Sequence, residues 1–166
     1  MLNDKYLILF DDEDISGVAT TETTSTNVFN SDGSQKEFSE AAAGDPILLN
    51  AAINDLGRAG RAKLNVSVGS TGWYCTGGTG TVDIKVYEHT AAAVASGTAV
   101  ISVNIPGIVI TAPAAHVVAG KYLFGLVLPP DLWGDTTNYF IGLSALVNTQ
   151  TLTAGTLNAW ISDAYA

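Results

Sequence analysis

Residues able to support catalysis are few and scattered in this 166-residue chain. The two histidines, His89 and His116, lie in separate contexts and form neither a recognisable catalytic triad nor a metal pair. Cys75 is the single cysteine, and no basic residue beside it in the sequence would activate its thiol. Ser144 lacks the second glycine of a nucleophile elbow. We therefore predict no catalytic residues, no metal and no cofactor, and we expect that the protein is not an enzyme.

Two other segments resemble ligand-binding loops but lack the residues that such loops need. Residues 76–81 are rich in glycine, yet no Lys-Ser/Thr pair follows them, so they predict a hairpin loop rather than a phosphate site. Residues 11–14 (Asp-Asp-Glu-Asp) lack the alternating ligands of a calcium loop and indicate a solvated acidic surface. A hydrolase remains an alternative, because the sequence does not show whether these carboxylates face one another across a cleft: Asp83, Glu88, Asp131 and Asp135.

Large aromatic side chains in loops are the more suggestive chemistry. Trp73 and Tyr74 lie in a segment of Gly, Ser and Thr, and Trp133 follows two prolines. Exposed aromatics of this kind are enriched at protein interfaces and in sugar-binding sites. Loops that fold back over the end of a barrel would explain them equally well. Trp160 lies within a predicted strand, and we expect it in the core.

The elements that must position these residues are predicted to be β-strands. Apolar and polar residues alternate over residues 64–69, 82–87 and 100–105, as in strands with one buried face. Gly- and Pro-rich segments separate these strands from further apolar runs at residues 121–128, 139–147 and 157–165. The pattern predicts an all-β, single-domain jelly-roll or β-sandwich of about eight antiparallel strands.

The charge of −9 is unevenly distributed along this one domain. Residues 1–45 hold ten acidic and two basic side chains, whereas residues 46–166 hold six and five. We predict that residues 1–45 form an acidic N-terminal arm and irregular segment, packed on or extending from the barrel, and that residues 46–166 form the sandwich core. Such a charge disfavours nucleic acid and anionic membranes as partners. The N-terminus shows no signal-peptide pattern, and no apolar run approaches the ~18 residues of a membrane span.

Several short segments, taken in order, resemble the jelly-roll cement (decoration) proteins of tailed-bacteriophage heads. They are NDKYLILFDD at residues 3–12, TSTNV at 24–28, GDPILL at 44–49, LPP at 128–130, YF at 139–140 and TAGTLNA at 153–159. The resemblance covers most of the chain, although residues 50–63 and 69–80 look like insertions relative to the family pattern. It implies a homo-oligomer, dimer or trimer, on the virion exterior after synthesis in the host cytoplasm. There it would bind the major capsid protein and stabilise contacts between shell subunits.

The resemblance also implies that an extended N-terminal segment pairs with the shell or with a sister subunit. The predicted contact residues are those of this segment and the loop aromatics: Tyr6, Leu7, Ile8, Leu9, Phe10, Asp11, Asp12, Trp73, Tyr74 and Trp133. We expect that removal of residues 1–14 leaves the barrel folded. The alternative is a carbohydrate-binding or adhesin-like β-sandwich in which the loop aromatics stack on sugars.

Overall fold

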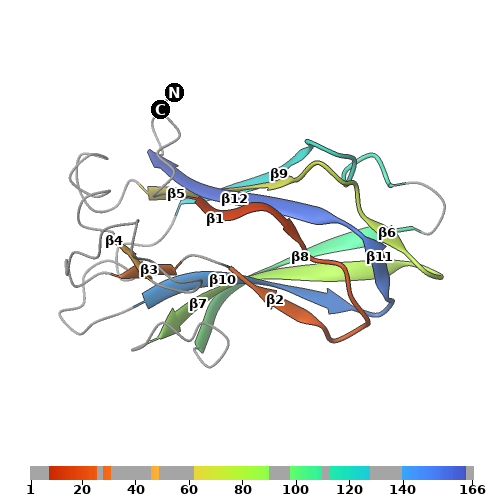
Figure 1. Cartoon of the computed structure of the whole chain (residues 1–166), viewed down its shortest axis with the longest axis horizontal. Helices are drawn as coiled ribbons and strands as arrows, with labels where there is room; N and C mark the ends of the chain where they lie inside the picture. The colour runs from red at the N-terminus through yellow and green to blue at the C-terminus, as the bar shows by residue number, and fades with distance from the viewer. Residues whose placement is uncertain are drawn as a thin grey trace.

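Alternating sequences make two-faced strands, and the described part of the chain consists of such strands joined by turns and loops. The computed structural model describes residues 8–25, 28–30, 46–48, 62–89, 98–109, 113–127 and 140–163. Within these ranges there are twelve strands and no helix, which confirms the predicted all-β class. Two sheets pack face to face as a sandwich (Figure 1).

The first sheet has four antiparallel strands in the order β1-β12-β5-β9. Their bounds are Ile8–Asp14 for β1, Thr156–Asp163 for β12, Ala62–Val68 for β5 and Tyr122–Val127 for β9. The strand β1 lies at the margin of this sheet, because among the described residues it pairs with β12 only.

Four antiparallel strands in the order β2-β10-β7-β8 make most of the second sheet. Their bounds are Glu22–Thr24 for β2, Phe140–Asn148 for β10, Gly80–His89 for β7 and Thr98–Ile108 for β8. At Phe140 and Ile141, where β10 begins, its partner is β3 instead of β2. The strand β4 pairs with β3 in parallel. These two short strands are Val28–Asn30 and Pro46–Leu48.

The connectivity of the eight main strands is that of a jelly roll. Numbered from one to eight along the chain, they are β1, β2, β5, β7, β8, β9, β10 and β12. The first sheet then reads 1-8-3-6 and the second 2-7-4-5, so neighbouring strands often come from distant parts of the chain. This is the order produced when two Greek keys are wrapped into two facing sheets. The fold prediction is confirmed down to its number of main strands.

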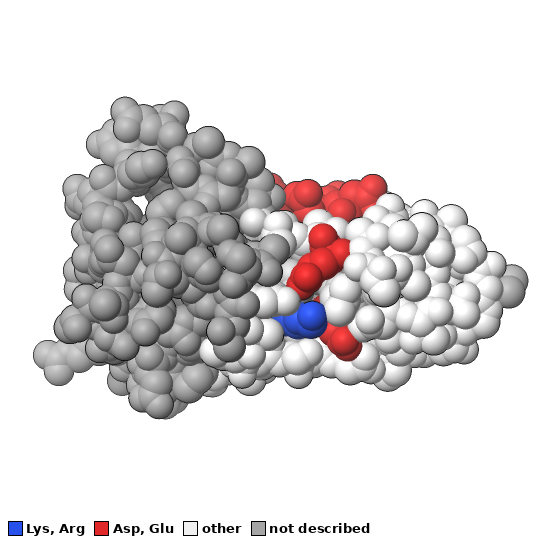
Figure 2. All heavy atoms as spheres, turned by 90° about the horizontal axis from the view of Figure 1, so that it is seen from below, with Lys and Arg blue, Asp and Glu red and all other residues white. Residues whose placement is uncertain are grey.

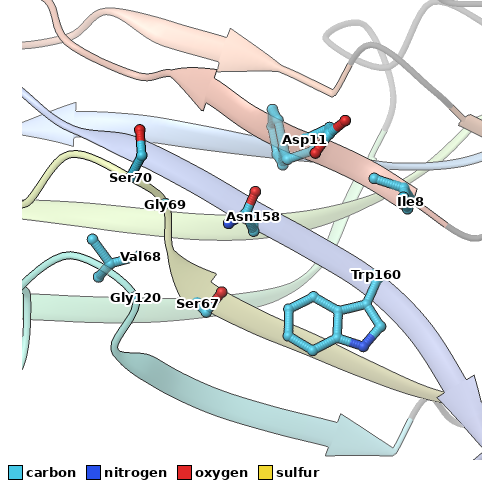
Figure 3. A pocket seen from close by; sticks show the side chains of 10 residues that line it. Ile8, Asp11, Ser67, Val68, Gly69, Ser70, Gly120, Asn158 and Trp160 are labelled. Atoms are coloured by element: carbon cyan, nitrogen blue, oxygen red, sulfur yellow. The ribbon is translucent and has the colours of Figure 1, made fainter. Parts of the chain in front are cut away.

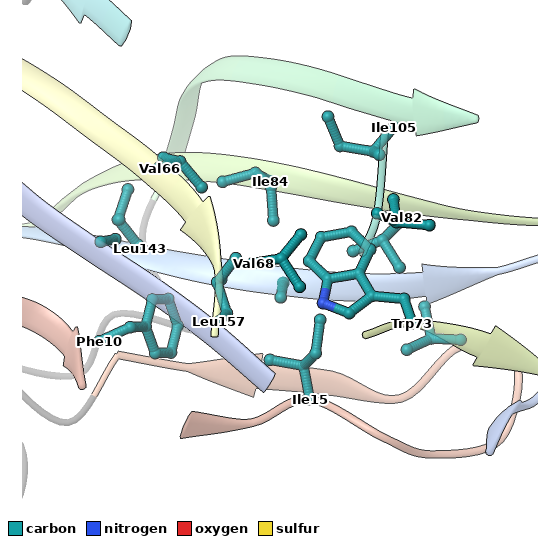
Figure 4. Close-up of a cluster of buried hydrophobic side chains, with 14 of the residues drawn as sticks. Phe10, Ile15, Val66, Val68, Trp73, Val82, Ile84, Ile105, Leu143 and Leu157 are labelled. Carbon is teal, nitrogen blue, oxygen red and sulfur yellow. The ribbon is translucent and has the colours of Figure 1, made fainter. Parts of the chain in front are cut away.

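The core fills the space between the two sheets with side chains from the inward phase of each strand. Val66 and Val68 of β5 face Val82 and Ile84 of β7 (Figure 4). These four side chains and Leu64 of β5 are almost completely buried. Each such side chain stabilises the fold by roughly 1.5–3 kcal/mol through removal of apolar surface from water. The sandwich therefore gains its stability from the alternation that is visible in the sequence.

A small two-stranded sheet and Trp73 close one end of the sandwich. The strands β6 (Tyr74–Cys75) and β11 (Leu152–Ala154) pair with each other. Trp73 is completely buried, and its indole Nε1 donates a hydrogen bond to the carbonyl of Thr156 at 2.9 Å. A Cβ at Gly155 would collide with the Trp73 ring, so glycine is needed there. The loop therefore folds back over the barrel end.

The N-terminal strand β1 is an integral part of the sandwich. Its register with β12 shifts between Ile8 and Phe10, and this bulge turns Leu9 and Phe10 inward together. Both side chains are only 1% exposed. Removal of residues 1–14 would take these two core side chains, which argues against the prediction that the barrel folds without them. Residues 8–14 are packed on the barrel instead of extending from it.

Candidate functional site

The predicted contact residues of the N-terminal segment divide into buried and exposed positions. Leu9 and Phe10 belong to the core and cannot offer their side chains to a partner. Ile8 is half-buried, whereas Asp11 and Asp12 are exposed. Tyr6 and Leu7 lie outside the described residues. The surface that β1 presents is therefore acidic rather than apolar.

Asp12 holds the bulged strand to two neighbouring segments. Its backbone has the left-handed φ of 54°, which Asp tolerates better than most residues. Its carboxylate accepts hydrogen bonds from the backbone N–H and hydroxyl of Ser70 and from the hydroxyl of Thr156, each at 2.6 Å. The Ser70 hydroxyl contributes most to lowering the pKa of Asp12, followed by the Thr156 hydroxyl and the Ser70 N–H. A Cβ at Gly69 would overlap the Asp12 carboxylate, so this arrangement requires glycine there.

The other acidic side chains of β1 lie along the margin of the sheet. Asp11 and Asp14 are exposed and Glu13 is half-buried. The carboxylate of Asp14 accepts a hydrogen bond from the Ser16 N–H at 2.8 Å, which lowers its pKa. This margin, defined by Asp11, Glu13 and Asp14, is called the acidic edge below.

The loop aromatics do not form a common surface. Trp73 is in the core, so its assignment as a contact residue or stacking platform is wrong: the loop turns inward and satisfies the indole N–H there. Tyr74 is half-buried in β6. Trp133 lies outside the described residues. The carbohydrate-binding alternative therefore loses one of its three platforms.

Trp160, which the sequence analysis assigned to the core, lies instead on the outer face of the first sheet. It alternates with the buried residues Ala159 and Ile161 of β12, so its side chain points away from the core. Its ring meets that of Tyr122 edge-on, with centroids 6.5 Å apart and an interplanar angle of 64°. The alternation of apolar residues along β12 already indicated an outward position for Trp160. The prediction followed the usual preference of tryptophan for burial instead.

A polar network fixes Tyr122 beside Trp160. The Tyr122 hydroxyl donates to Asn65 Oδ1 at 2.9 Å, and Asn65 Nδ2 donates to the Ser162 hydroxyl at 2.8 Å. A Cβ at Gly125 would overlap the Tyr122 hydroxyl, so glycine on β9 makes room for the ring. The two aromatic side chains are therefore held in place before any ligand arrives.

A groove of about 510 Å³ lies beside this aromatic pair, on the outer face of the first sheet. Figure 3 shows Trp160, Asn158 and Ser67 side by side across β12 and β5, with Ile8 and Asp11 above them on β1. The complete lining is Ile8, Phe10, Asp11, Ser67, Val68, Gly69, Ser70, Gly120, Asn158 and Trp160. The groove therefore joins one indole to several small polar groups.

The outer face of the second sheet carries a different cluster, centred on Glu22. Figure 2 shows acidic and basic side chains meeting on this face. Glu22 Oε1 accepts hydrogen bonds from the hydroxyls of Ser144 at 2.6 Å and Tyr87 at 2.7 Å, and Lys85 Nζ lies 3.7 Å away. Burial raises the pKa of Glu22, but these two hydroxyls and Lys85 outweigh it, and the net shift is downward. Each group is thus engaged by its neighbours.

Those residues considered for catalysis whose side chains the structure describes are buried or bonded to neighbours. Ser144 is completely buried and donates its hydrogen to Glu22, an acid kept ionised. Burial raises the pKa of the Cys75 thiol, which disfavours the nucleophilic thiolate form. His116 Nε2 donates to the Pro106 carbonyl at 2.6 Å. Asp83 accepts from Asn104 and Asn148.

The structure does not describe the side chains of the remaining catalytic candidates. Glu88 and His89 end β7 without described side chains, and Asp131 and Asp135 fall outside the described residues. Within the described ranges, no group of three or more His, Cys, Asp or Glu side chains could hold a metal ion. In the same ranges, no helix has the length and apolarity needed to cross a membrane.

Comparisons with protein families and with curated proteins found no relative of this chain. No protein-family profile matches the sequence, and no curated protein is significantly similar to it.

Proposed function

We propose that the chain is a structural virion protein that binds the outer surface of a phage head and stabilises contacts between major capsid protein subunits. The resemblance in sequence and the jelly-roll connectivity support this proposal. The hydrogen bonds of Ser144 and His116, and the raised pKa of the buried Cys75 thiol, support a role in binding rather than in catalysis. The observation that carries the proposal furthest is the acidic edge of β1.

A sheet margin with bulges and carboxylates is suited to a selective partner. The two register shifts in β1 interrupt the regular ladder that a foreign strand would need. Carboxylates repel other acidic edges and discourage indiscriminate strand addition. The same groups attract a basic surface and orient it during encounter. The acidic edge thus favours one complementary partner, for which we propose a basic surface of the shell protein.

Symmetry would convert weak contacts of this kind into stable attachment. We propose a dimer or trimer of the chain, in which each copy meets an equivalent shell surface. The second and later contacts then form at a high effective concentration, so the assembly holds more tightly than one contact could. Closed symmetry also covers sheet margins that would otherwise remain open.

The test uses heads assembled without this protein, to which purified chain is added back. The wild type should saturate the outer surface, and uptake should weaken as salt rises, because screening reduces attraction between exposed charges. The Glu13→Gln/Asp14→Asn double variant should bind at least about tenfold more weakly. The Asp83→Asn variant removes a carboxylate from the other sheet and serves as the control.

Bound copies per head, measured by gel densitometry, decide the outcome. Equal uptake of the double variant and the wild type would show that the acidic edge does not contribute to binding of the heads. Failure of the wild type to bind heads at low salt would refute the function itself.

A further inference from the structure

The groove on the outer face of the first sheet combines the chemical features of a sugar-binding site. Trp160 contributes a flat apolar surface, while Ser67, Ser70 and Asn158 contribute uncharged polar groups, and Asp11 contributes one carboxylate. Its lining contains no Lys or Arg. A pyranose ring has the matching character, because its C–H face packs on an indole and its hydroxyls bond to amides and carboxylates.

Ser67 adds a second polar side chain to the groove. The residue is 9% exposed and belongs to the lining. A hydroxyl in this position can both donate and accept a hydrogen bond to a polar ligand. Asn158 Oδ1 accepts from the Asp12 N–H at 2.6 Å, and this bond orients the amide so that its NH₂ group remains for a ligand.

The aromatic platform is preorganised, which lowers the entropic cost of binding. Tyr122 contacts the Trp160 ring edge-on and is itself bonded to the buried Asn65. The rings therefore need not be ordered by the ligand. The volume of about 510 Å³ also falls in the range of small-molecule sites.

Two other ligand classes fit the groove less well. A phosphate or nucleic acid would need cations, and the lining has none. A peptide adding as a strand would need an open and regular backbone edge. The strands β12 and β5 are paired on both sides, and the open strand β1 carries two register shifts. We propose that this groove binds a neutral saccharide, with Trp160 as the stacking platform and Ser67, Asn158 and Asp11 as hydrogen-bonding groups. This site is distinct from the predicted loop aromatics and does not depend on the proposed virion function.

The test measures saccharide binding to the purified full chain. The probes are an array of neutral glycans, followed by calorimetry with array hits and with cellohexaose, chitohexaose and maltohexaose. At least one neutral glycan should bind with a Kd of about 1 mM or tighter. Trp160→Ala should weaken that binding at least about tenfold, whereas Trp160→Phe, which keeps an aromatic face, should lose less. Ser67→Ala should weaken it by roughly 3- to 10-fold.

Matched controls separate a local effect from unfolding. Val127 is 53% exposed on the same sheet but outside the groove lining, so Val127→Ala should bind as the wild type does. Each variant should keep the wild-type circular dichroism spectrum. Absence of binding to every neutral glycan, or binding that survives Trp160→Ala unchanged, would overturn the saccharide site. Uptake by heads is measured in a separate experiment. The result of the saccharide test therefore neither supports nor refutes the proposed virion function.

Discussion

Asp12 shows how one side chain can hold a bulged strand in place. It takes the left-handed backbone conformation and bonds to Ser70 and Thr156, so β1, β12 and the turn after β5 are joined at one carboxylate. Only the ionised form accepts all three hydrogen bonds, which is why they lower the pKa of Asp12. The stability that it contributes must therefore depend on pH.

The sign of this dependence follows from the lowered pKa. An unfolded Asp titrates near pH 3.9, so the stabilisation is fully present above that value. It is lost as the pH falls through the lower pKa of the folded state. Asp12→Asn should melt at a lower temperature than the wild type at pH 7, and the difference should shrink below about pH 4. Thermal unfolding followed by circular dichroism from pH 2.5 to 7 measures this.

Asp11→Asn provides the control, because it removes the same charge from the neighbouring exposed position. Its melting temperature should stay close to that of the wild type throughout. A difference between Asp12→Asn and the wild type that is the same at pH 2.5 and pH 7 would show that the carboxylate charge is not responsible.

The three residues Trp73, Trp160 and Asp12 also show what the sequence could not reveal. Trp73 lies in a Gly/Ser/Thr loop, and only the fold shows that this loop turns inward over the core. For Trp160, alternation indicated the outer face, but the general preference of tryptophan for burial favoured the wrong interpretation. The Asp12 contacts join residues 58 and 144 positions apart, which no local pattern encodes.

The element that departs most from expectation is β1. Its apolar run and acids suggested an arm, because a short run between charged residues carries no sign of its partner strand. The partner is β12, at the other end of the chain. By contrast, β5 and β7 and their inward residues follow directly from period-two alternation. Local pattern predicted strands well, whereas pairing depended on contacts across the whole chain.

Removal of β1 should therefore unfold the protein. Burial of Leu9 and Phe10 contributes roughly 1.5–3 kcal/mol each, a large part of the 5–15 kcal/mol by which domains are stable. A chain that starts at residue 15 should lose its cooperative urea transition. In the full chain, Leu9→Ala should cost about 2–5 kcal/mol of unfolding free energy. Ile8→Ala, at a half-buried position on the outer face, should cost clearly less.

These urea midpoints distinguish a core strand from an appended arm. If the shortened chain unfolds with the midpoint and slope of the full chain, β1 contributes nothing to the sandwich. Equal costs for Leu9→Ala and Ile8→Ala would likewise contradict the inward orientation of Leu9.

At the scale of the whole molecule, the jelly roll leaves three outer surfaces, two of which, the acidic edge and the Trp160 groove, share Asp11. The acidic edge is the proposed shell contact, the Trp160 groove is the proposed saccharide site, and the face around Glu22 is internally bonded. Neither the acidic edge nor the groove requires a reactive group. The central claim is that the protein works through contact area repeated by symmetry.

An electron cryomicroscopy map of heads carrying the protein tests that claim most directly. We expect density for the sandwich on the outer surface, arranged as a dimer or trimer about a symmetry axis. The acidic edge of β1 should face basic side chains of the major capsid protein. A map without this density on the outer surface, or with every copy attached through a surface other than the acidic edge, would contradict the account.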